Sequence, residues 1–335
     1  MPDIAYPEFS RHRAGSAVWR CDPNDRYDSL EPSVFHEKWW LDIVTGGRWQ
    51  YVESLHHGCV VGRLPYLSGK WRWFRTIHMP QLTHFLGPAI TPGSGGSDTR
   101  LLRRIGITRD LIRQLPPGNM PLKLKMQRDI DDVIAFQMEG FETAVRFTYE
   151  IEPAPSETIW RGMRDKTRNV ARKAATLYSV DDDMDPEEFI RLFELNVAVR
   201  GWRSIFDMTV ARTVIAASRQ RNRGRVLAVR DRDGVAKAAI FCVWDHAACY
   251  YVLSTRSPDS SSGAITLLLW VAIQSAVDGG LVFDFDGLAH DGIVLLYSGF
   301  GAEVKTRFVV SRTTLAFRLA QEARRLFRQP ESPFH

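Results

Sequence analysis

The stretch from residue 225 to residue 310 constrains the fold most, because its apolar residues change period in a fixed order. A strongly apolar helix is predicted at 263–277 and a buried strand at 281–285, followed by a short helix at 292–298 and a last strand at 303–310. Three strand-like segments come before them: 225–230, 235–244 and 248–255. Such a succession predicts an α/β domain in which helices flank a mixed, mostly antiparallel sheet.

The first half of the chain predicts a similar order of elements. A helix that ends at Gly46-Gly47 is followed by a three-stranded meander, a helix at 98–115, and three short elements: a strand at 122–126, a helix at 130–138 and a strand at 143–151. The turns of the meander are expected at His57-Gly58 and Ser68-Gly69. Pro153 and Pro155 then interrupt the pattern, and a long helix is expected from residue 157 to about 177.

The length of 335 residues agrees with two domains of ordinary size. We therefore predict a duplicated α/β fold with three parts: an N-terminal extension (1–31), a first domain (32–153) and a second domain (154–335).

The net charge of +5 is too small for a chain of this size to indicate an extended nucleic-acid surface. The excess is local, because residues 161–173 contain six basic residues and one acidic residue. This segment is predicted either to contact phosphates of a ligand or to face solvent as an ordinary charged helix. Arg168 is the candidate contact, since it falls in the middle of the predicted helix near the domain cleft.

Cysteine spacing and apolar runs exclude several classes. The four cysteines show no CxxC pattern, so neither a zinc site nor a disulfide framework is expected. The longest apolar run, 264–273, is far shorter than the roughly twenty residues of a membrane-spanning helix. The first 33 residues carry several acids and no apolar stretch typical of a signal peptide. We expect a cytoplasmic protein without a resident metal.

A small-residue loop lies directly before the apolar helix and includes Ser261, Ser262, Gly263 and Ala264. Backbone N–H groups at a helix N-terminus bind anions, so the loop is a candidate pyrophosphate site. The alternative is a serine-rich helix cap without a ligand.

The buried strand at 281–285 continues into Asp286-Gly287 and places Asp284 and Asp286 on one face. Buried carboxylates are costly unless they are paired, and functional sites often hold them, so both are candidates for acid-base chemistry or substrate binding. His290 is a candidate partner for the base. The alternative is that Asp284 pairs with a core arginine and Asp286 caps the next turn.

Three motifs in order resemble the FemAB-like, double-GNAT acyltransferases. The strand Phe283 to Gly287 is followed by Gly292-Ile293 and then by Tyr297 to Ala302, which is similar to the closing signature of these proteins. Two further segments resemble the first domain's loop and the basic helix between the domains: 80–88 and 164–174. The resemblance covers residues 32–312 and implies two tandem GNAT-like domains.

The resemblance also implies roles for particular residues. Tyr251, Leu253 and Ser254 match the splayed strand along which the donor's pantetheine arm lies. Tyr297 matches a tyrosine that protonates the leaving thiolate, although an aromatic packed under the last strand is the alternative. Trp40 and Trp202 are candidates for an acceptor pocket, with core packing as the alternative.

These expectations define three hypotheses. The first is an N-acyltransferase that moves an acyl group from acyl-CoA to an amine of a small molecule or peptide, with Asp286 as the base and Tyr297 as the acid. The second keeps the fold but uses an aminoacyl-tRNA donor, because the loop before the helix lacks the usual GNAT phosphate-binding pattern. The third is a binding protein without catalysis on the same scaffold.

Overall fold

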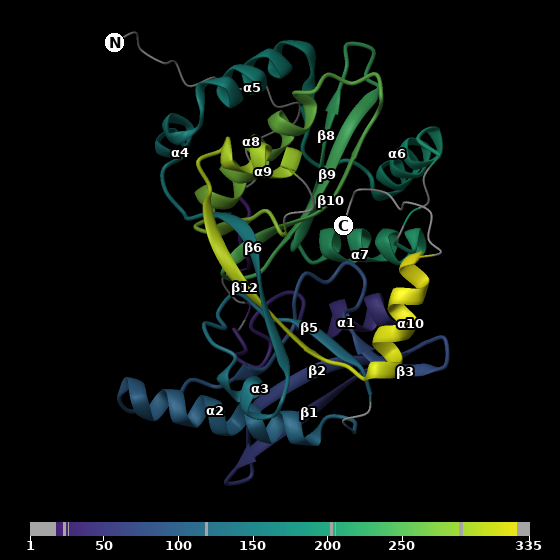
Figure 1. Ribbon diagram of the computed structural model, residues 1–335. Helices are drawn as coiled ribbons and strands as arrows, with labels where there is room; N and C mark the ends of the chain where they lie inside the picture. The colour runs from purple at the N-terminus through teal and green to yellow at the C-terminus, as the bar shows by residue number, and fades with distance from the viewer. Residues whose placement is uncertain are drawn as a thin grey trace. The chain divides into compact units, whose positions relative to one another are not determined.

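The computed structural model describes residues 18–22, 25, 27–117, 120–201, 204, 206–287 and 291–326. Their contacts divide the chain into two compact units. Unit 1 is formed by Thr148–Lys305 together with the short segment around Trp19, and unit 2 by residues 27–147 and 306–326. Two strands, β6 (Glu142–Ile151) and β12 (Glu303–Arg312), carry the chain from one unit to the other (Figure 1).

This division differs from the sequence expectation, which ends the first domain at residue 153. In the structure the units separate within β6, between residues 147 and 148, and the chain returns to unit 2 at residue 306. Pro153 and Pro155 mark where β6 stops, but they carry no information about which sheet each part of that strand joins. The return of the chain depends on pairing between distant segments, which a local pattern does not contain.

Unit 1 is built on a mixed sheet whose strands follow the order β6-β11-β10-β9-β8-β7. Only β10 and β11 are paired in parallel among the described strand pairs of this unit, and the helix α8 (Ala264–Asp278) is the crossover between them. The remaining strands are β7 (Ser179–Asp181), β8 (Gly224–Arg230), β9 (Ala236–Trp244), β10 (Ala248–Arg256) and β11 (Val282–Asp284).

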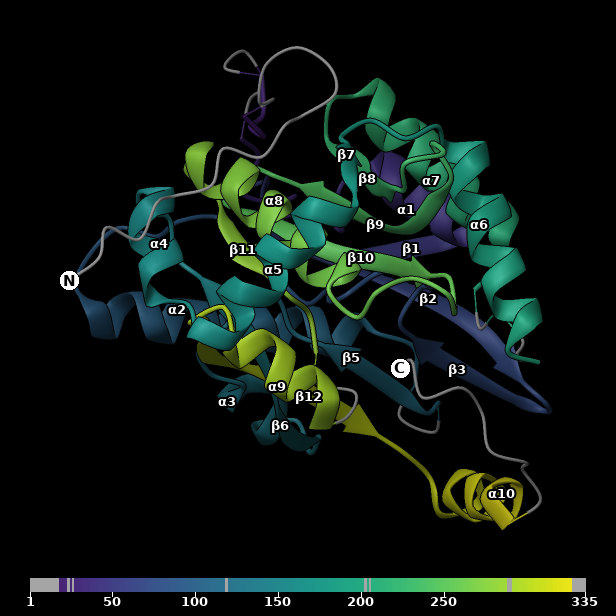
Figure 2. The ribbon, with the colours of Figure 1, turned by 90° about the horizontal axis from the view of Figure 1, so that it is seen from above.

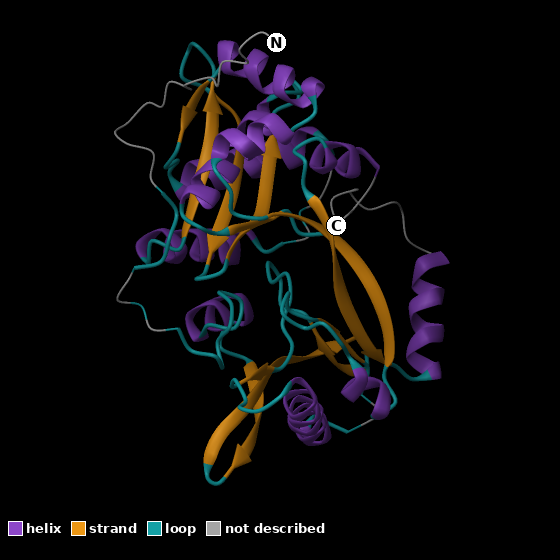
Figure 3. Ribbon diagram, turned by 90° about the vertical axis from the view of Figure 1, so that its left-hand side faces the viewer, coloured by secondary structure: helices purple, strands orange, loops and turns teal. Residues whose placement is uncertain are grey.

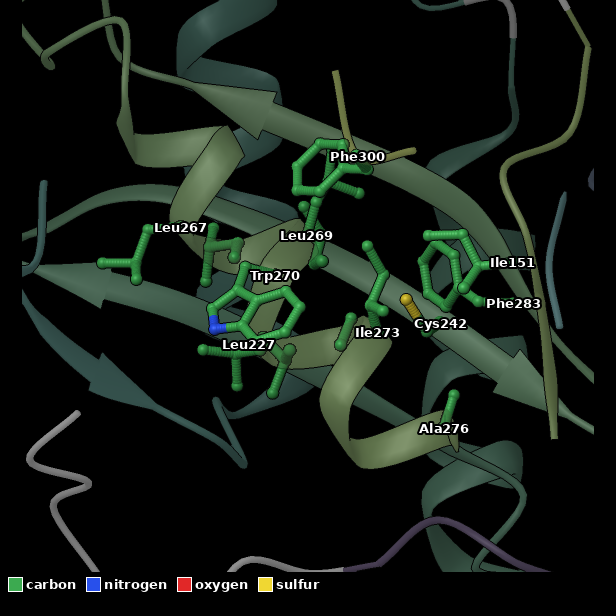
Figure 4. Close-up of a cluster of buried hydrophobic side chains, with 14 of the residues drawn as sticks. Ile151, Leu227, Cys242, Leu267, Leu269, Trp270, Ile273, Ala276, Phe283 and Phe300 are labelled. Atoms are coloured by element: carbon green, nitrogen blue, oxygen red, sulfur yellow. The ribbon is translucent and has the colours of Figure 1, made fainter. Parts of the chain in front are cut away.

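Helices cover both faces of this sheet, with α8 on one face and α6 (Pro186–Val199) and α7 (Met208–Gln220) on the other (Figures 1 and 2). The start of α6 is specified locally, because the Asp185 side chain accepts the N–H groups of Glu187 and Glu188 and Pro186 occupies the first helical position. The core between α8 and the sheet is packed with large side chains that include Trp270, Phe283 and Phe300 (Figure 4).

The single helix expected at 157–177 is wrong, because the structure has two: α4 (Ser156–Gly162) and α5 (Asp165–Leu177). The break at Met163-Arg164 follows Gly162, which favours helix poorly. The Arg164 N–H donates to the carbonyl of Gly299, 3.0 Å away, rather than continuing the first helix.

The strands of unit 2 follow the order β1-β2-β3-β5-β12, with β4 beside β2. Its strands are β1 (Trp49–His56), β2 (Cys59–Trp71), β3 (Phe74–His78), β4 (Ala89–Ile90) and β5 (Leu122–Lys125), and its helices are α1 (Lys38–Thr45), α2 (Ser97–Gln114), α3 (Ile134–Met138) and α10 (Leu315–Leu326).

The second turn of the meander lies further along the chain than its glycine indicates. β2 runs through Gly69 and turns at Arg72-Trp73, so the hairpin is longer than predicted. Trp71 and Phe74 face each other across this hairpin, and both rings pack against Phe317 of α10. That packing with a distant helix explains why the local turn signal at Ser68-Gly69 does not decide the register.

Two structural features are absent from the described residues. No helix among them combines the length and apolar character needed to cross a membrane. No group of three or more His, Cys, Asp or Glu side chains in the described part of the chain is placed to hold a metal ion.

Candidate active site

The edge of β10 is the first part of the site. β11 pairs with β10 only as far as Tyr250, opposite Asp284, whereas β9 pairs with β10 all the way to Arg256. A register shift between Tyr251 and Leu253 marks a bulge at the point where the two strands part. Among the described residues no strand therefore pairs with the other edge of β10 beyond Tyr250, which makes this edge a candidate for contact with a ligand.

The N-terminus of α8 lies at the end of the loop that leaves β10. No side chain caps this helix. The Ser261 N–H donates to the Tyr178 hydroxyl at 2.7 Å, but the Ser262 and Gly263 N–H groups have no acceptor among the described residues. The Ser261 hydroxyl is buried and also has no partner there. Free donors at the positive end of a 15-residue helix fit the predicted anion site.

The basic helix α5 packs beside this N-terminus (Figure 2). A Cβ on Gly263 would lie 3.0 Å from the Val170 carbonyl oxygen, so the glycine permits the close approach. Lys166 and Lys173 are four residues before and three residues after Val170, which places them on the same face of α5, and both are exposed. These two lysines, which the sequence argument did not single out, add positive charge next to the loop.

Two tyrosines lie close enough to influence each other's ionisation. Burial raises the pKa of Tyr297 well above its usual value, and Tyr251, Asp286 and Asp284 raise it further. Burial also raises the pKa of Tyr251, against a hydrogen bond with Ser254 that lowers it. The structure thus brings together Tyr251, Asp284, Asp286 and Tyr297, and it keeps both phenols protonated over the physiological range.

The ring of Tyr297 is also a packing element. It belongs to α9 (Asp291–Ser298), lies 4.4 Å from the Phe285 ring between centroids, and makes an edge contact with Tyr149. Its side chain is almost completely buried. Tyr297 therefore packs in the core and also lies within electrostatic range of Tyr251, Asp286 and Asp284.

Asp284 and Asp286 are linked by a hydrogen bond, but β11 ends at Asp284, so the strand alternation does not extend to Asp286. The Asp284 carboxylate accepts hydrogen bonds from the Thr148 hydroxyl at 2.8 Å and from the Asp286 N–H at 2.9 Å. Asp286 adopts a left-handed conformation with φ of 50°, which turns the chain directly after the strand. Asp284 is 2% exposed, whereas Asp286 is half-buried.

A third carboxylate, which the sequence argument missed, joins this group. Glu150 on β6 is directly opposite Asp284 in the antiparallel pair and is 3% exposed. Directly opposed residues point to the same face of a sheet, so two buried acids lie side by side. The alternation of residues 142–151 places Glu150 on the face of Thr148, but its burial depends on pairing with a strand far along the sequence.

Two candidate ligand residues have other roles in the structure. The Arg168 guanidinium donates to the carbonyls of Trp160, Arg161 and Met163 and pairs with Asp165, so it caps the end of α4. Trp40 is completely buried in unit 2, where its indole N–H donates to Thr83 at 3.0 Å, as the packing alternative expects. His290 and Trp202 lie outside the described residues.

A hollow of about 500 Å³ opens elsewhere in unit 1, beside the first turn of α6 and along α7. Charged residues of both signs line it, and none of the predicted site residues does. We therefore place the candidate site at the edge of β10, the start of α8 and the buried acids, and not at this hollow.

Comparison with known proteins agrees with this arrangement. Residues 161–291 match the sequence model of a family described as an acetyltransferase (GNAT) domain. No curated protein matches the chain in sequence.

Three solved structures are similar in fold. FemX has a TM-score of 0.62 at 11% identity, with 85% of this chain and 93% of FemX covered. The C-terminal domain of a putative lysylphosphatidylglycerol synthetase from Agrobacterium fabrum has a TM-score of 0.55 at 11% identity, with 86% and 91% covered. L-PGS from Bacillus licheniformis has a TM-score of 0.52 at 10% identity, with 87% and 92% covered.

The order of elements in unit 1, the matched segment and these similarities confirm the predicted α/β fold with two GNAT-like halves. Residues 161–291 match the acetyltransferase (GNAT) domain model, and the chain is similar in fold to FemX and L-PGS.

Proposed function

We propose that this protein is an N-acyltransferase that moves an acyl group from a donor bound to unit 1 onto an amine. The observation that carries the proposal is the bulged edge of β10, which no strand of the described residues covers beyond Tyr250 and which leads directly to the uncapped N-terminus of α8. A single extended donor can use both features at once, with its carbonyl against the strand and its phosphates at the helix.

The donor end of the site fits an acyl-CoA. A backbone N–H group of Tyr251, Leu253 or Ser254 on the edge away from β9 would donate to the acyl carbonyl, where negative charge develops as the amine attacks. The Ser262 and Gly263 N–H groups, the buried Ser261 hydroxyl and the α8 dipole would hold the pyrophosphate, with Lys166 and Lys173 adding charge. Ala264 begins the helix that closes this end.

The acceptor end fits an amine that arrives as an ammonium ion. Asp284, Asp286 and Glu150 place three carboxyl groups at the end of β11, and carboxylates attract an ammonium ion. The ammonium ion first loses one proton to solvent to give the neutral amine, and the attacking nitrogen loses a second proton as the amide forms. We assign that proton to Asp286, which is the most exposed of the three.

Tyr297 is assigned to the leaving thiolate. An ordinary thiol has a pKa near 8.5, and the Tyr297 pKa is raised above its usual value, so full proton transfer from the phenol would be uphill. A neutral phenol is instead suited to donate a hydrogen bond to the sulfur as the carbon–sulfur bond breaks. The thiolate can then take its proton from solvent or from the protonated Asp286.

Two versions of this function differ in the acyl donor, which is either acyl-CoA or aminoacyl-tRNA. Acyl-CoA is the first choice because the α8 N-terminus and the two lysines offer a compact phosphate site. Aminoacyl-tRNA is the alternative, supported by the FemAB-like fold and by the absence of an arginine or glutamine in the loop at 257–263.

The test is a thermal-shift screen over CoA thioesters from acetyl to palmitoyl, followed by a thiol-release assay with small amines and peptides. An acyltransferase of the first kind is stabilised by at least one thioester and releases CoA only when an amine is present. Activity that requires charged tRNA and disappears with ribonuclease supports the alternative. Neither stabilisation nor turnover with either donor would sink both versions.

A further inference from the structure

The tip of the β2–β3 hairpin is the most exposed aromatic site of unit 2 and belongs to no part of the proposed reaction. Trp73 is 87% exposed and sits in a two-residue turn with Arg72. Full exposure of a tryptophan costs the hydrophobic stabilisation that burial would give, so such a residue marks a contact surface rather than a packing position.

Positive charge surrounds this tryptophan. Lys70 and Arg75 are directly opposite each other on the hairpin, and like charges in such a pair repel and weaken it. Lys70, Arg72 and Arg75 are all exposed, and none of them pairs with a carboxylate among the described residues. An anionic surface at the tip would offset this repulsion.

The helix α10 extends the same surface. Phe317 fastens the helix to the hairpin through Trp71 and Phe74, with ring centroids 5.1 and 5.3 Å away. Leu315 and Leu319, two residues to either side of Phe317, lie on one face of the helix at a spacing of four and remain 74% and 62% exposed. Figures 2 and 3 show that one side of α10 faces away from the strands of its unit.

The charge of α10 is also mainly positive. Its sequence contains three arginines and one glutamate. Arg318 pairs with Glu142, and Glu322 is exposed on the same helix. Among the side chains that the structure describes, the cations without a carboxylate partner on this surface therefore lie on the hairpin, and the helix contributes its exposed leucines.

We propose that Lys70, Arg72, Trp73, Arg75, Leu315 and Leu319 form a docking surface for an anionic lipid bilayer, with the hairpin tip inserted at the level of the headgroups. Tryptophan prefers the membrane interface, unpaired cations bind anionic headgroups, and an amphipathic helix with exposed leucines lies along the same boundary. The surface combines exposed apolar side chains with cations that have no carboxylate partner among the described residues. Both features match an anionic membrane, which offers an apolar interior and negative headgroups.

The experiment is vesicle co-sedimentation of the full chain at low salt. Vesicles of phosphatidylcholine with about one third phosphatidylglycerol are compared with vesicles of phosphatidylcholine alone. The wild-type protein is expected to sediment with the anionic vesicles and to be released as salt is raised. Lys70→Gln with Arg75→Gln should weaken binding about 25-fold, at about fivefold for each cation. Trp73→Ala and Leu319→Glu should each weaken it about tenfold.

Matched controls come from α2 of the same unit, which lies away from the hairpin in Figures 1 and 2. Leu102 is 70% exposed and Arg100 is exposed, so Leu102→Glu and Arg100→Gln change the same kinds of residue outside the proposed surface. Equal loss in these controls, or no preference for anionic vesicles, overturns the proposal. So does a wild-type dimer that Trp73→Ala converts to a monomer without any vesicle binding, because a second copy would then cover the surface.

Discussion

Asp284 and Glu150 lie directly opposite each other on β11 and β6, and both carboxylates are almost completely buried. Thr148 and the Asp286 backbone hold Asp284 in place by hydrogen bonds. Lys305 lies within electrostatic range of Glu150, and we propose that an ammonium substrate adds a second positive charge beside these acids.

The charge of Asp284 and Glu150 can be tested by substitution. Asp284→Asn keeps the acceptor oxygen for Thr148 but removes one negative charge, so we expect the KM for the amine to rise about tenfold or more while the melting temperature does not fall. Steady-state kinetics at varied amine and fixed donor measure the first, and thermal unfolding measures the second. Glu150→Gln is a parallel test. It should also raise the KM for the amine without lowering the melting temperature. An unchanged KM in both variants would show that the acids do not meet the amine.

Tyr297→Phe tests the leaving-group assignment. The aromatic ring and its contact with Phe285 are retained, so the fold should keep its melting temperature, whereas kcat should fall about 100-fold with little change in KM for the donor. Tyr51→Phe, at an exposed tyrosine of unit 2, is the control and should leave both constants unchanged. A fully active Tyr297→Phe enzyme would leave the tyrosine with a packing role only.

Gly263→Ala tests the junction of α5 and α8. The new Cβ would lie 3.0 Å from the Val170 carbonyl and 3.1 Å from Ala174, so the helices must separate. We expect a loss of about 1–3 kcal/mol of stability and weaker stabilisation by the donor, measured by denaturant unfolding with and without acyl-CoA. Gly106→Ala in α2, where a Cβ meets nothing within 4 Å, should be neutral or stabilising. If both variants behave alike, the close approach at Gly263 is not needed.

We predict that the stability of unit 2 depends on pH because of His36. Burial lowers its pKa from 6.5 to about 4, although a hydrogen bond to the Gly87 carbonyl opposes the shift. The unfolded chain therefore takes up a proton below about pH 6.5 that the folded histidine accepts only near pH 4. Stability from this residue is present above pH 6.5 and is lost as the pH falls through that window, by about 3 kcal/mol in total.

Thermal unfolding between pH 7.5 and pH 4.5 measures this slope. His36→Gln should be less stable at neutral pH but should lose less stability on acidification than the wild type. Burial also lowers the pKa of His78, so part of the slope should remain in the variant. A variant with the full wild-type slope would contradict the assignment to His36.

Much of unit 1 follows from local pattern. The strands and helices expected between residues 225 and 310 lie within two residues of those observed, because the period of apolar residues changes wherever the backbone changes. The alternation at 283–286 likewise places Asp284 on the face opposite Phe283 and Phe285.

The remaining features depend on contacts that the local sequence does not encode. In the sequence Arg168 looks like an ordinary cation of a charged helix. In the structure the chain breaks at Met163, and Arg168 caps the end of α4 by donating to the Met163 carbonyl. Glu150 becomes a buried partner of Asp284 only through the pairing of β6 with β11. Ser68-Gly69 resembles a turn, but Phe317 holds the rings beyond it and extends the hairpin.

The return of the chain to unit 2 at residue 306 sets an order for its assembly during synthesis. The β5 strand pairs with β3 and with β12, and the residues of β12 leave the ribosome only after the whole of 148–305. Until then one edge of β5 has no neighbour and the hairpin lacks Phe317. Nascent unit 2 therefore exposes an unpaired, aggregation-prone strand edge at a stage when most strands of unit 1 have already been synthesised. A protease cut after residue 305 would accordingly spare unit 1 and return unit 2 to that incomplete state.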